Sequence, residues 1–296
     1  TIPILYPSSV HEFVRFGLLG IAMSRYSGCW VAMKTIADTV ESTATVEVGG
    51  DLDFEIKIPT EAEFAIPEGG LNYRWPDDRW TQDHRLQNYK AYAALAFARA
   101  NRIDRVVLNP AQAQYGIVAS GKSYEETREA LSWLGIDDAM AERIGLRLYK
   151  IGMPWPLEPH GVRDFAQGLK EILVVEERRE MVENQVKQAL FNVPTETRAR
   201  IVGKFDENDK PVFPLDAEMP AEGIAEILVS RLLKLDLPHD IRKHLVDAIE
   251  VWHRRRKLLD KYLPPTLRSI SVLGAHAPAA PDKPATPATP AAPAKK

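Results

Sequence analysis

Regular alternation of strand-like and helix-like segments between residues 115 and 215 constrains the fold of this chain more than any other feature. Four apolar segments, at 115–120, 144–153, 171–177 and 199–205, have the β-branched composition of strands. Amphipathic segments at 123–135, 159–169 and 180–193 separate them and are typical of helices. Alternation at this spacing predicts an α/β fold, a parallel sheet with helices on both faces.

The stretch "GIVASGKS", residues 116–123, matches the Gly-x4-Gly-Lys-Ser string of a phosphate-binding loop. A true loop of this type curls its backbone amides around phosphate, whereas Ile117 and Val118 are stiff β-branched residues that favour a strand. We therefore predict that 115–120 is the strand itself, and that Ser123 caps the next helix with Glu126 completing a capping box.

A P-loop-type nucleotidase stays open as an alternative because Glu176 and Glu177 end the strand "EILVVEE", where such an enzyme places acidic groups. The simpler hypothesis is that these carboxylates lie at a sheet edge and cap the following helix.

The rest of the chain divides by composition. Residues 1–48 suggest strand, helix and strand, with Ser9 and Glu12 as a second capping box and an apolar helix face formed by Val10, Phe13, Val14, Gly17 and Leu18. Residues 49–112 suggest an irregular or β-hairpin excursion followed by a helix over 84–101. The domain with alternating elements is expected over 113–215, a helical segment over 216–264 with a stripe of Ile241, Leu245, Ala248 and Trp252, and a disordered Pro/Ala linker over 265–296.

Composition excludes several classes of function. A net charge of -3 gives no general attraction to nucleic acid or to an anionic membrane, and no apolar run approaches the roughly 20 residues of a membrane span. Cys29 is the one cysteine, which excludes an internal disulfide or a cysteine-held cluster and suits the cytoplasm. The seven histidines lack metal-ligand spacing.

Ionisable residues gather after the apolar segment "CWVAM". Lys34, Asp38 and Glu41 follow it closely, where a strand would leave the core. They could line a cleft or belong to a solvated loop, and the spacing does not decide between the two.

Several long segments, including "CWVAMKTIADTVEST", "KAYAALAFARANRIDRVVL", "YGIVASGKSYEETREAL", "IGLRLYKIGMPWPLEPHGV" and "ILVVEERREMVENQVKQAL", together resemble the single-chain bacterial indolepyruvate ferredoxin oxidoreductases. This family belongs to the thiamine-diphosphate-dependent 2-oxoacid:ferredoxin oxidoreductases. The resemblance implies a transketolase C-terminal-like domain over 113–215 and, in residues 1–48, the last part of the domain that binds the cofactor's aminopyrimidine ring.

The same resemblance implies oxidative decarboxylation of an aryl 2-oxoacid, with electrons passing to ferredoxin and the acyl group to coenzyme A. Implied cofactors are thiamine diphosphate, Mg2+ and 4Fe-4S clusters, and the implied assembly is a homo-oligomer with the remaining domains or subunits of the oxidoreductase. Lys34, Thr35, Glu41 and Ser42 are the residues expected to contact cofactor or substrate.

The chain departs from the family's pattern in three ways. It lacks the Gly-Asp-Gly…Asn signature for magnesium and diphosphate, the upstream activating glutamate and the cluster cysteines. In addition, the sequence starts at Thr1. We therefore expect an internal fragment that is inactive alone. A non-catalytic dimerisation or scaffold module is the alternative.

Overall fold

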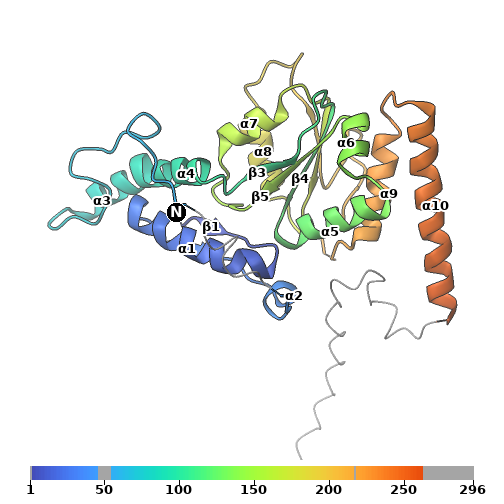
Figure 1. The fold of residues 1–296 in the computed structure, drawn as a ribbon. Coiled ribbons are helices and arrows are strands. Elements are labelled where there is room, and N and C mark those ends of the chain that lie inside the picture. Colours follow the sequence, from blue (N-terminus) through green and yellow to red (C-terminus); the bar gives the residue numbers. More distant parts are fainter. Residues whose placement is uncertain (1, 46–54, 217, 263–296) are drawn as a thin grey trace, which may run out of the picture.

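The centre of the molecule is a five-stranded sheet (Figure 1). The computed structural model describes residues 2–45, 55–216 and 218–262. Its strands are β3 (Arg105–Leu108), β4 (Tyr115–Ser120), β5 (Leu146–Ile151), β6 (Glu171–Val175) and β7 (Arg200–Val202), in the order β3-β5-β4-β6-β7. All neighbours are parallel except β3, which is antiparallel to β5. The predicted α/β fold with a mainly parallel sheet is confirmed.

Helices cover both faces of this sheet (Figure 1). One face packs against α5 (Gly121–Trp133), α6 (Asp138–Ile144), α9 (Ala221–Leu232) and α10 (His239–Tyr262). The other packs against α7 (Pro159–Ala166) and α8 (Val182–Leu190). The predicted stripe of α10 is confirmed, because Ile241, Leu245 and Trp252 are buried. The sheet includes β3, which precedes residue 113, the predicted start of the domain with alternating elements. The division of the chain into domains stays a prediction.

The N-terminal part is a smaller unit beside the sheet. It comprises β1 (Ile4–Leu5), α1 (Val10–Ser27), β2 (Ala32–Met33) and α2 (Ala37–Val40), and β1 pairs in parallel with β2. The predicted order of strand, helix and strand is confirmed, although the second strand consists of Ala32 and Met33 alone before the chain turns into α2. The reason is the local sequence, in which polar Lys34 and Thr35 interrupt the apolar run.

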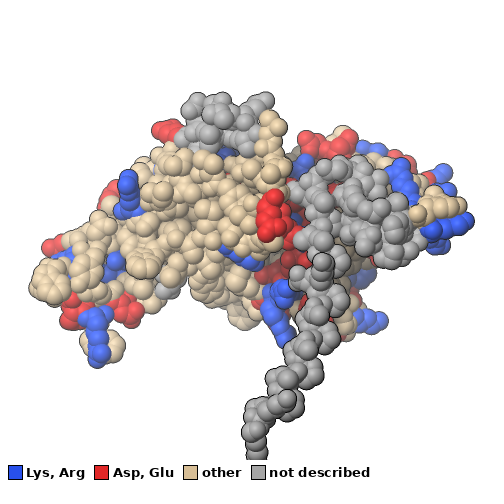
Figure 2. Space-filling model, turned by 90° about the horizontal axis from the view of Figure 1, so that it is seen from below, with Lys and Arg blue, Asp and Glu red and all other residues tan. Residues whose placement is uncertain are grey.

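The buried face of α1 differs from the predicted one. Phe16, Leu19 and Met23 are at most 1% exposed and pack against α4 (Ala91–Ala100), whereas Val14 and Leu18 are 52% and 43% exposed. The helix is apolar on more than one side, so periodicity alone could not select the side that faces α4. Figure 2 shows the molecule from below relative to Figure 1, and a broad part of this surface carries few charged side chains.

Both predicted capping boxes were wrong. Ser9 precedes α1 without a side-chain cap, because the Glu12 carboxylate instead accepts from the Ser8 backbone N–H at 2.9 Å. At α5 the first helical residue is Gly121 and Ser120 holds the cap position. Glu126 accepts the backbone N–H of Ala221, at the start of α9, at 2.8 Å. Tertiary partners have replaced the local ones.

Residues 55–78 are irregular, and the part of the expected hairpin at 46–54 lies outside the described residues. The following helix begins earlier than predicted, with α3 (Arg79–Arg85), a π-helical turn η1 (Leu86–Lys90) and α4 in succession. Asp78 starts it by accepting from the N–H groups of Trp80 and Thr81. The predicted Pro/Ala linker at 265–296 also lies outside the described residues.

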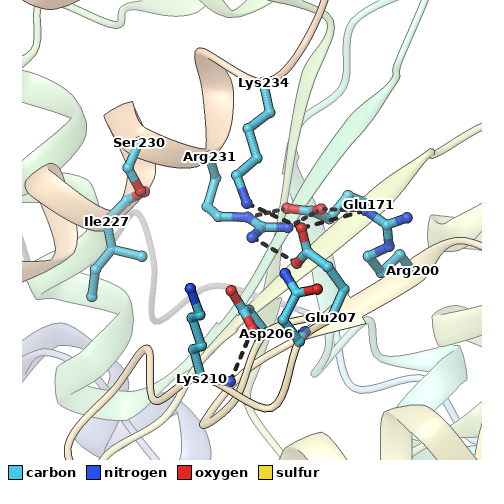
Figure 3. Close-up of polar contacts among 10 residues, drawn as sticks. Glu171, Arg200, Asp206, Glu207, Lys210, Ile227, Ser230, Arg231 and Lys234 are labelled. Carbon is cyan, nitrogen blue, oxygen red and sulfur yellow. Dashed lines mark hydrogen bonds and ion pairs between the residues drawn. The ribbon is translucent and has the colours of Figure 1, made fainter.

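An ion-pair network fastens α9 to the sheet at the amino end of β6 (Figure 3). Arg231 of α9, 3% exposed at its side chain, pairs with both carboxylate oxygens of Glu171 and, at 2.8 Å, with Glu207. Arg200 and Lys234 complete the network. The guanidinium contacts Glu171 through two N–H groups and Glu207 through a third, which fixes the orientation of α9 as well as its position.

Candidate functional site

Open parallel sheets bind ligands in a crevice at the carboxyl ends of the two strands where the connections diverge, and these strands are β4 and β6 here. The chain leaves β4 into α5 on one face and leaves β6 toward α8 on the other, so the two connections diverge between adjacent strands. Lys122 follows β4 and Glu177 follows β6. These residues, with Asp38, Glu218 and Tyr6, form the crevice cluster.

Lys122 is the centre of the crevice cluster. Its ammonium lies 3.2 Å from Glu218, 3.7 Å from Asp38 and 3.8 Å from Glu177, and its side chain is 13% exposed. Burial alone would lower the pKa of Lys122, but the three carboxylates together raise it above the ordinary value. Lys122 is therefore a fixed cation that is already surrounded by acidic groups.

Tyr6 occupies the space in front of the α5 N-terminus. A side-chain carbon added to Gly121, whose φ is +50°, would lie 2.0 Å from the Tyr6 ring. Burial raises the pKa of the Tyr6 hydroxyl, and the nearby backbone N–H of Lys122 opposes this rise. In a phosphate-binding loop, amides at this position point at phosphate. In this chain the Tyr6 ring occupies that position.

Ile117 and Val118 lie inside β4, fully buried, with Ile117 paired to Leu148 and Leu173 on either side. The prediction that these residues form a strand is confirmed. Since the backbone between the two glycines is extended, it cannot wrap an anion. The nucleotidase alternative is not favoured by this geometry.

The two strand-end glutamates also have structural partners. Glu176 accepts the N–H groups of Val182 and Glu183 and thereby caps α8, as the simpler hypothesis stated. Burial raises the pKa of Glu176, and these N–H bonds oppose the rise. The prediction is wrong for Glu177, which contacts Lys122 at 3.8 Å and the Met219 N–H at 3.5 Å and so belongs to the crevice cluster.

The four residues expected to contact cofactor lie on one segment beside the crevice. Lys34 is exposed and its ammonium stands 4.3 Å above the centre of the Tyr6 ring, so it borders the crevice cluster. Thr35 and Glu41 are exposed, and the Ser42 hydroxyl donates to the Thr39 carbonyl at 2.8 Å. Asp38, from the same segment, makes the direct link to Lys122. No sequence pattern indicated that Tyr6 would join them.

Metal and cluster ligands do not gather in the described part of the chain. Among the described residues no three His, Cys, Asp or Glu side chains are placed to hold a metal ion. Cys29 is 2% exposed, and burial raises the pKa of its thiol, the opposite of what a cluster ligand needs. Within residues 2–45, 55–216 and 218–262, no helix has the length and apolar character to cross a bilayer.

The sheet topology and crevice define an α/β domain of the open, mainly parallel type, in which the lysine of the Gly-Lys-Ser string is a structural cation. A known domain family, the indolepyruvate ferredoxin oxidoreductase middle domain, matches residues 104–216 by sequence. This segment is therefore similar to that domain of the indolepyruvate ferredoxin oxidoreductases, and the resemblance predicted from the sequence is confirmed.

Curated relatives extend the match beyond this domain. The indolepyruvate oxidoreductase subunit IorA of Pyrococcus abyssi is 31% identical over 199 residues, which cover 64% of this chain and 28% of the relative. The subunit of the same name from Methanothermobacter thermautotrophicus is 27% identical over 186 residues, 62% of this chain and 28% of the relative. The chain thus matches under a third of the length of these relatives.

Among solved structures, a 2-oxoglutarate:ferredoxin oxidoreductase from Magnetococcus marinus, with 2-oxoglutarate, coenzyme A and succinyl-CoA bound, aligns with a TM-score of 0.45 at 12% identity. The alignment covers 78% of this chain and 42% of that one. An inactive β4 tetramer of a split-gene transketolase aligns with a TM-score of 0.31 at 13% identity, over 49% and 55% of the two chains.

Proposed function

We propose that this chain is a portion of an indolepyruvate (aryl 2-oxoacid):ferredoxin oxidoreductase, which converts the 2-oxoacid to acyl-CoA and passes electrons to ferredoxin. The observation that carries the proposal is the family match over residues 104–216, supported by relatives named indolepyruvate oxidoreductase subunit. Neither the scaffold module nor the nucleotidase receives comparable support. A bacterial origin stays a prediction. A cytoplasmic location is also a prediction, and it rests on the presence of a single cysteine.

The cofactors of the proposed reaction would be bound mainly outside this chain. A 4Fe-4S cluster needs several thiolates, and the sequence contains one cysteine. Thiamine diphosphate would supply the carbanion chemistry, and Mg2+ would hold its diphosphate. Lys34, Thr35, Glu41 and Ser42 are the residues that we propose contact the cofactor or the substrate carboxylate, since their segment is accessible beside the crevice cluster.

The exposed side of α1 is where we propose that the remaining domains of the oxidoreductase pack. Val14, Leu18 and Ile21 are 52%, 43% and 56% exposed, and Trp30, which follows α1 in the chain, is 82% exposed. A contiguous apolar surface on a small α/β unit is typical of an interface. A homo-oligomer of the complete enzyme is part of the same proposal.

The test compares this chain with the complete protein. Indolepyruvate-dependent and coenzyme A-dependent reduction of ferredoxin is expected from the complete protein and not from this chain alone. In the complete protein, Glu41→Gln is expected to weaken cofactor binding or turnover, while Glu61→Gln, an exposed glutamate on the irregular excursion, serves as the matched control. Turnover by the isolated chain would contradict the assignment of the cofactor sites, and inactivity of the complete protein toward every aryl 2-oxoacid would contradict the function.

A further inference from the structure

A second polar site, which shares no residue with the crevice cluster, lies in a cleft between α1, α5 and strands β3 and β5. The cleft has a volume of about 460 Å³, within the range of small-molecule sites. Its charged lining consists of Arg15, Arg105, Arg128, Lys150, Glu12 and Glu125. Four cationic side chains thus face two carboxylates, an excess of two positive charges.

The carboxylates of the cleft are engaged by protein groups. Glu12, 10% exposed at its side chain, receives Lys150 at 2.5 Å, Arg105 at 3.0 Å and the Ser8 N–H at 2.9 Å. Glu125 accepts from the Ser8 hydroxyl at 2.5 Å. The Glu12 carboxylate is therefore shared by two cations of the cleft, Lys150 and Arg105.

Tyr124 brings further cations of the cleft together. The Lys150 ammonium stands 4.3 Å above the Tyr124 ring. Burial raises the pKa of the Tyr124 hydroxyl, and the nearby Arg128 cation opposes this rise. Lys150 is 2% exposed. Burial lowers its pKa despite the contact with Glu12, and the neighbouring Arg105 adds repulsion. An anion entering the cleft would relieve this accumulation of positive charge.

We propose that this cleft binds a phosphate group, either free or as part of a small phosphate ester. Guanidinium groups present forked donors that match the oxygens of phosphate, and three arginines line the one cleft. Its volume exceeds that of a single phosphate, which favours the ester. The Gly-Lys-Ser string contributes nothing to this site, because Lys122 lies in the crevice cluster with its own acidic partners.

The test is direct binding of inorganic phosphate and of adenosine monophosphate to the purified chain, measured by calorimetry at low ionic strength. Arg128→Gln removes an exposed cation of the cleft, and Arg255→Gln removes an exposed arginine of α10 as the matched control. We expect Arg128→Gln to weaken binding at least fivefold and Arg255→Gln to leave it unchanged. Arg15→Gln is a second variant with the same expected effect, should Arg128→Gln disturb the fold.

The possible outcomes decide both the proposal and the source of the phosphate. Tighter binding of the ester than of inorganic phosphate assigns the site to an ester, and the reverse assigns it to free phosphate. Absence of saturable binding at 10 mM of either probe, roughly the weak end of specific affinities, would overturn the proposal. So would equal losses in Arg128→Gln and Arg255→Gln, or acetate binding as tightly as phosphate. None of these results depends on oxidoreductase activity.

Discussion

Replacing Lys150 by Met tests whether the buried pair with Glu12 holds α1 against the sheet. Lys150 belongs to β5 and Glu12 to α1, so their 2.5 Å contact joins elements that are 138 positions apart in the chain. Met has a similar length and no charge, so it fills most of the same space. The variant leaves the Glu12 carboxylate buried with Arg105 as its remaining cationic partner.

Removal of one partner from a buried ion pair costs about 3–5 kcal/mol, because the other charge stays desolvated. Arg105 still contacts the same carboxylate oxygen at 3.0 Å, and its side chain is 32% exposed. We therefore expect the free energy of unfolding to fall by about 3 kcal/mol, near the lower end of this range. For a chain of this size, this corresponds to a decrease in melting temperature of roughly 6–12 °C.

The loss should depend on pH in a defined direction. Burial alone would raise the pKa of Glu12, but Lys150, Ser8 and Arg105 together hold it below its ordinary 4.5. A lowered carboxyl pKa contributes stability above the unfolded pKa, and this contribution disappears as the pH falls through the folded value. The difference between the parent chain and Lys150→Met should therefore be full at pH 7 and shrink below about pH 4.

Urea unfolding at pH 7 and at about pH 3 measures both effects. Arg143→Met is the control, since its partner Asp240 is 64% exposed and the surface pair should contribute no measurable stability. The double variant Glu12→Gln/Lys150→Met should recover part of the loss, because it removes the stranded charge. A loss under about 1 kcal/mol in Lys150→Met, or no recovery in the double variant, would refute the argument that the buried charge causes the effect.

Four further outcomes follow from the same structure. Gly121→Ala should destabilise the chain by more than about 1–2 kcal/mol in urea unfolding, since a left-handed φ and a 2.0 Å approach to the Tyr6 ring both oppose a side chain; equal stability would contradict this packing. Lys122→Met should leave ATP binding, expected to be absent, unchanged in equilibrium dialysis; saturable binding that the variant abolishes would revive the phosphate loop. Asp104→Asn should gain stability over the parent as the pH rises from about 4 to 7, because burial raises the folded pKa of Asp104 to about 7 and the parent loses stability across that window; parallel pH profiles would contradict it. Arg231→Met should lower the melting temperature more than Lys234→Met, since Arg231 is 3% and Lys234 51% exposed at the side chain; equal shifts would show that the buried part of the network has no special role.

Sequence reasoning predicted the sheet where one segment determines its own structure. The strand at Ile117 and Val118 and the stripe on α10 follow from β-branched stiffness and from helical periodicity, which are local properties. The strand β3 was missed because "RVVL" is four residues long and pairs antiparallel with a strand some forty positions later. Short edge strands acquire their conformation from the neighbour they pair with.

The same limit explains the errors at helix ends. Ser9 with Glu12 and Ser123 with Glu126 satisfy the local capping pattern, yet both glutamates bind groups from distant segments. A capping box contributes roughly 1 kcal/mol, whereas a buried ammonium or an orphan helix N–H elsewhere costs more if left unpaired. Glu12 and Glu126 therefore bind partners from distant segments instead of completing the local capping pattern.

Lys122 and Lys150 show why the position of a charge in the fold decides its function more than the motif that contains it. Lys122 stands in a phosphate-binding string, but Asp38, Glu177 and Glu218 surround it and the Tyr6 ring fills the space before the helix. A phosphate placed there would meet three negative charges at close range. Lys150 stands in no motif, yet it shares its single carboxylate with Arg105 in a cleft of net positive charge. Since the field at a site is the sum over all its charges, the cleft beside α1 attracts an anion and the crevice with the Gly-Lys-Ser string repels one.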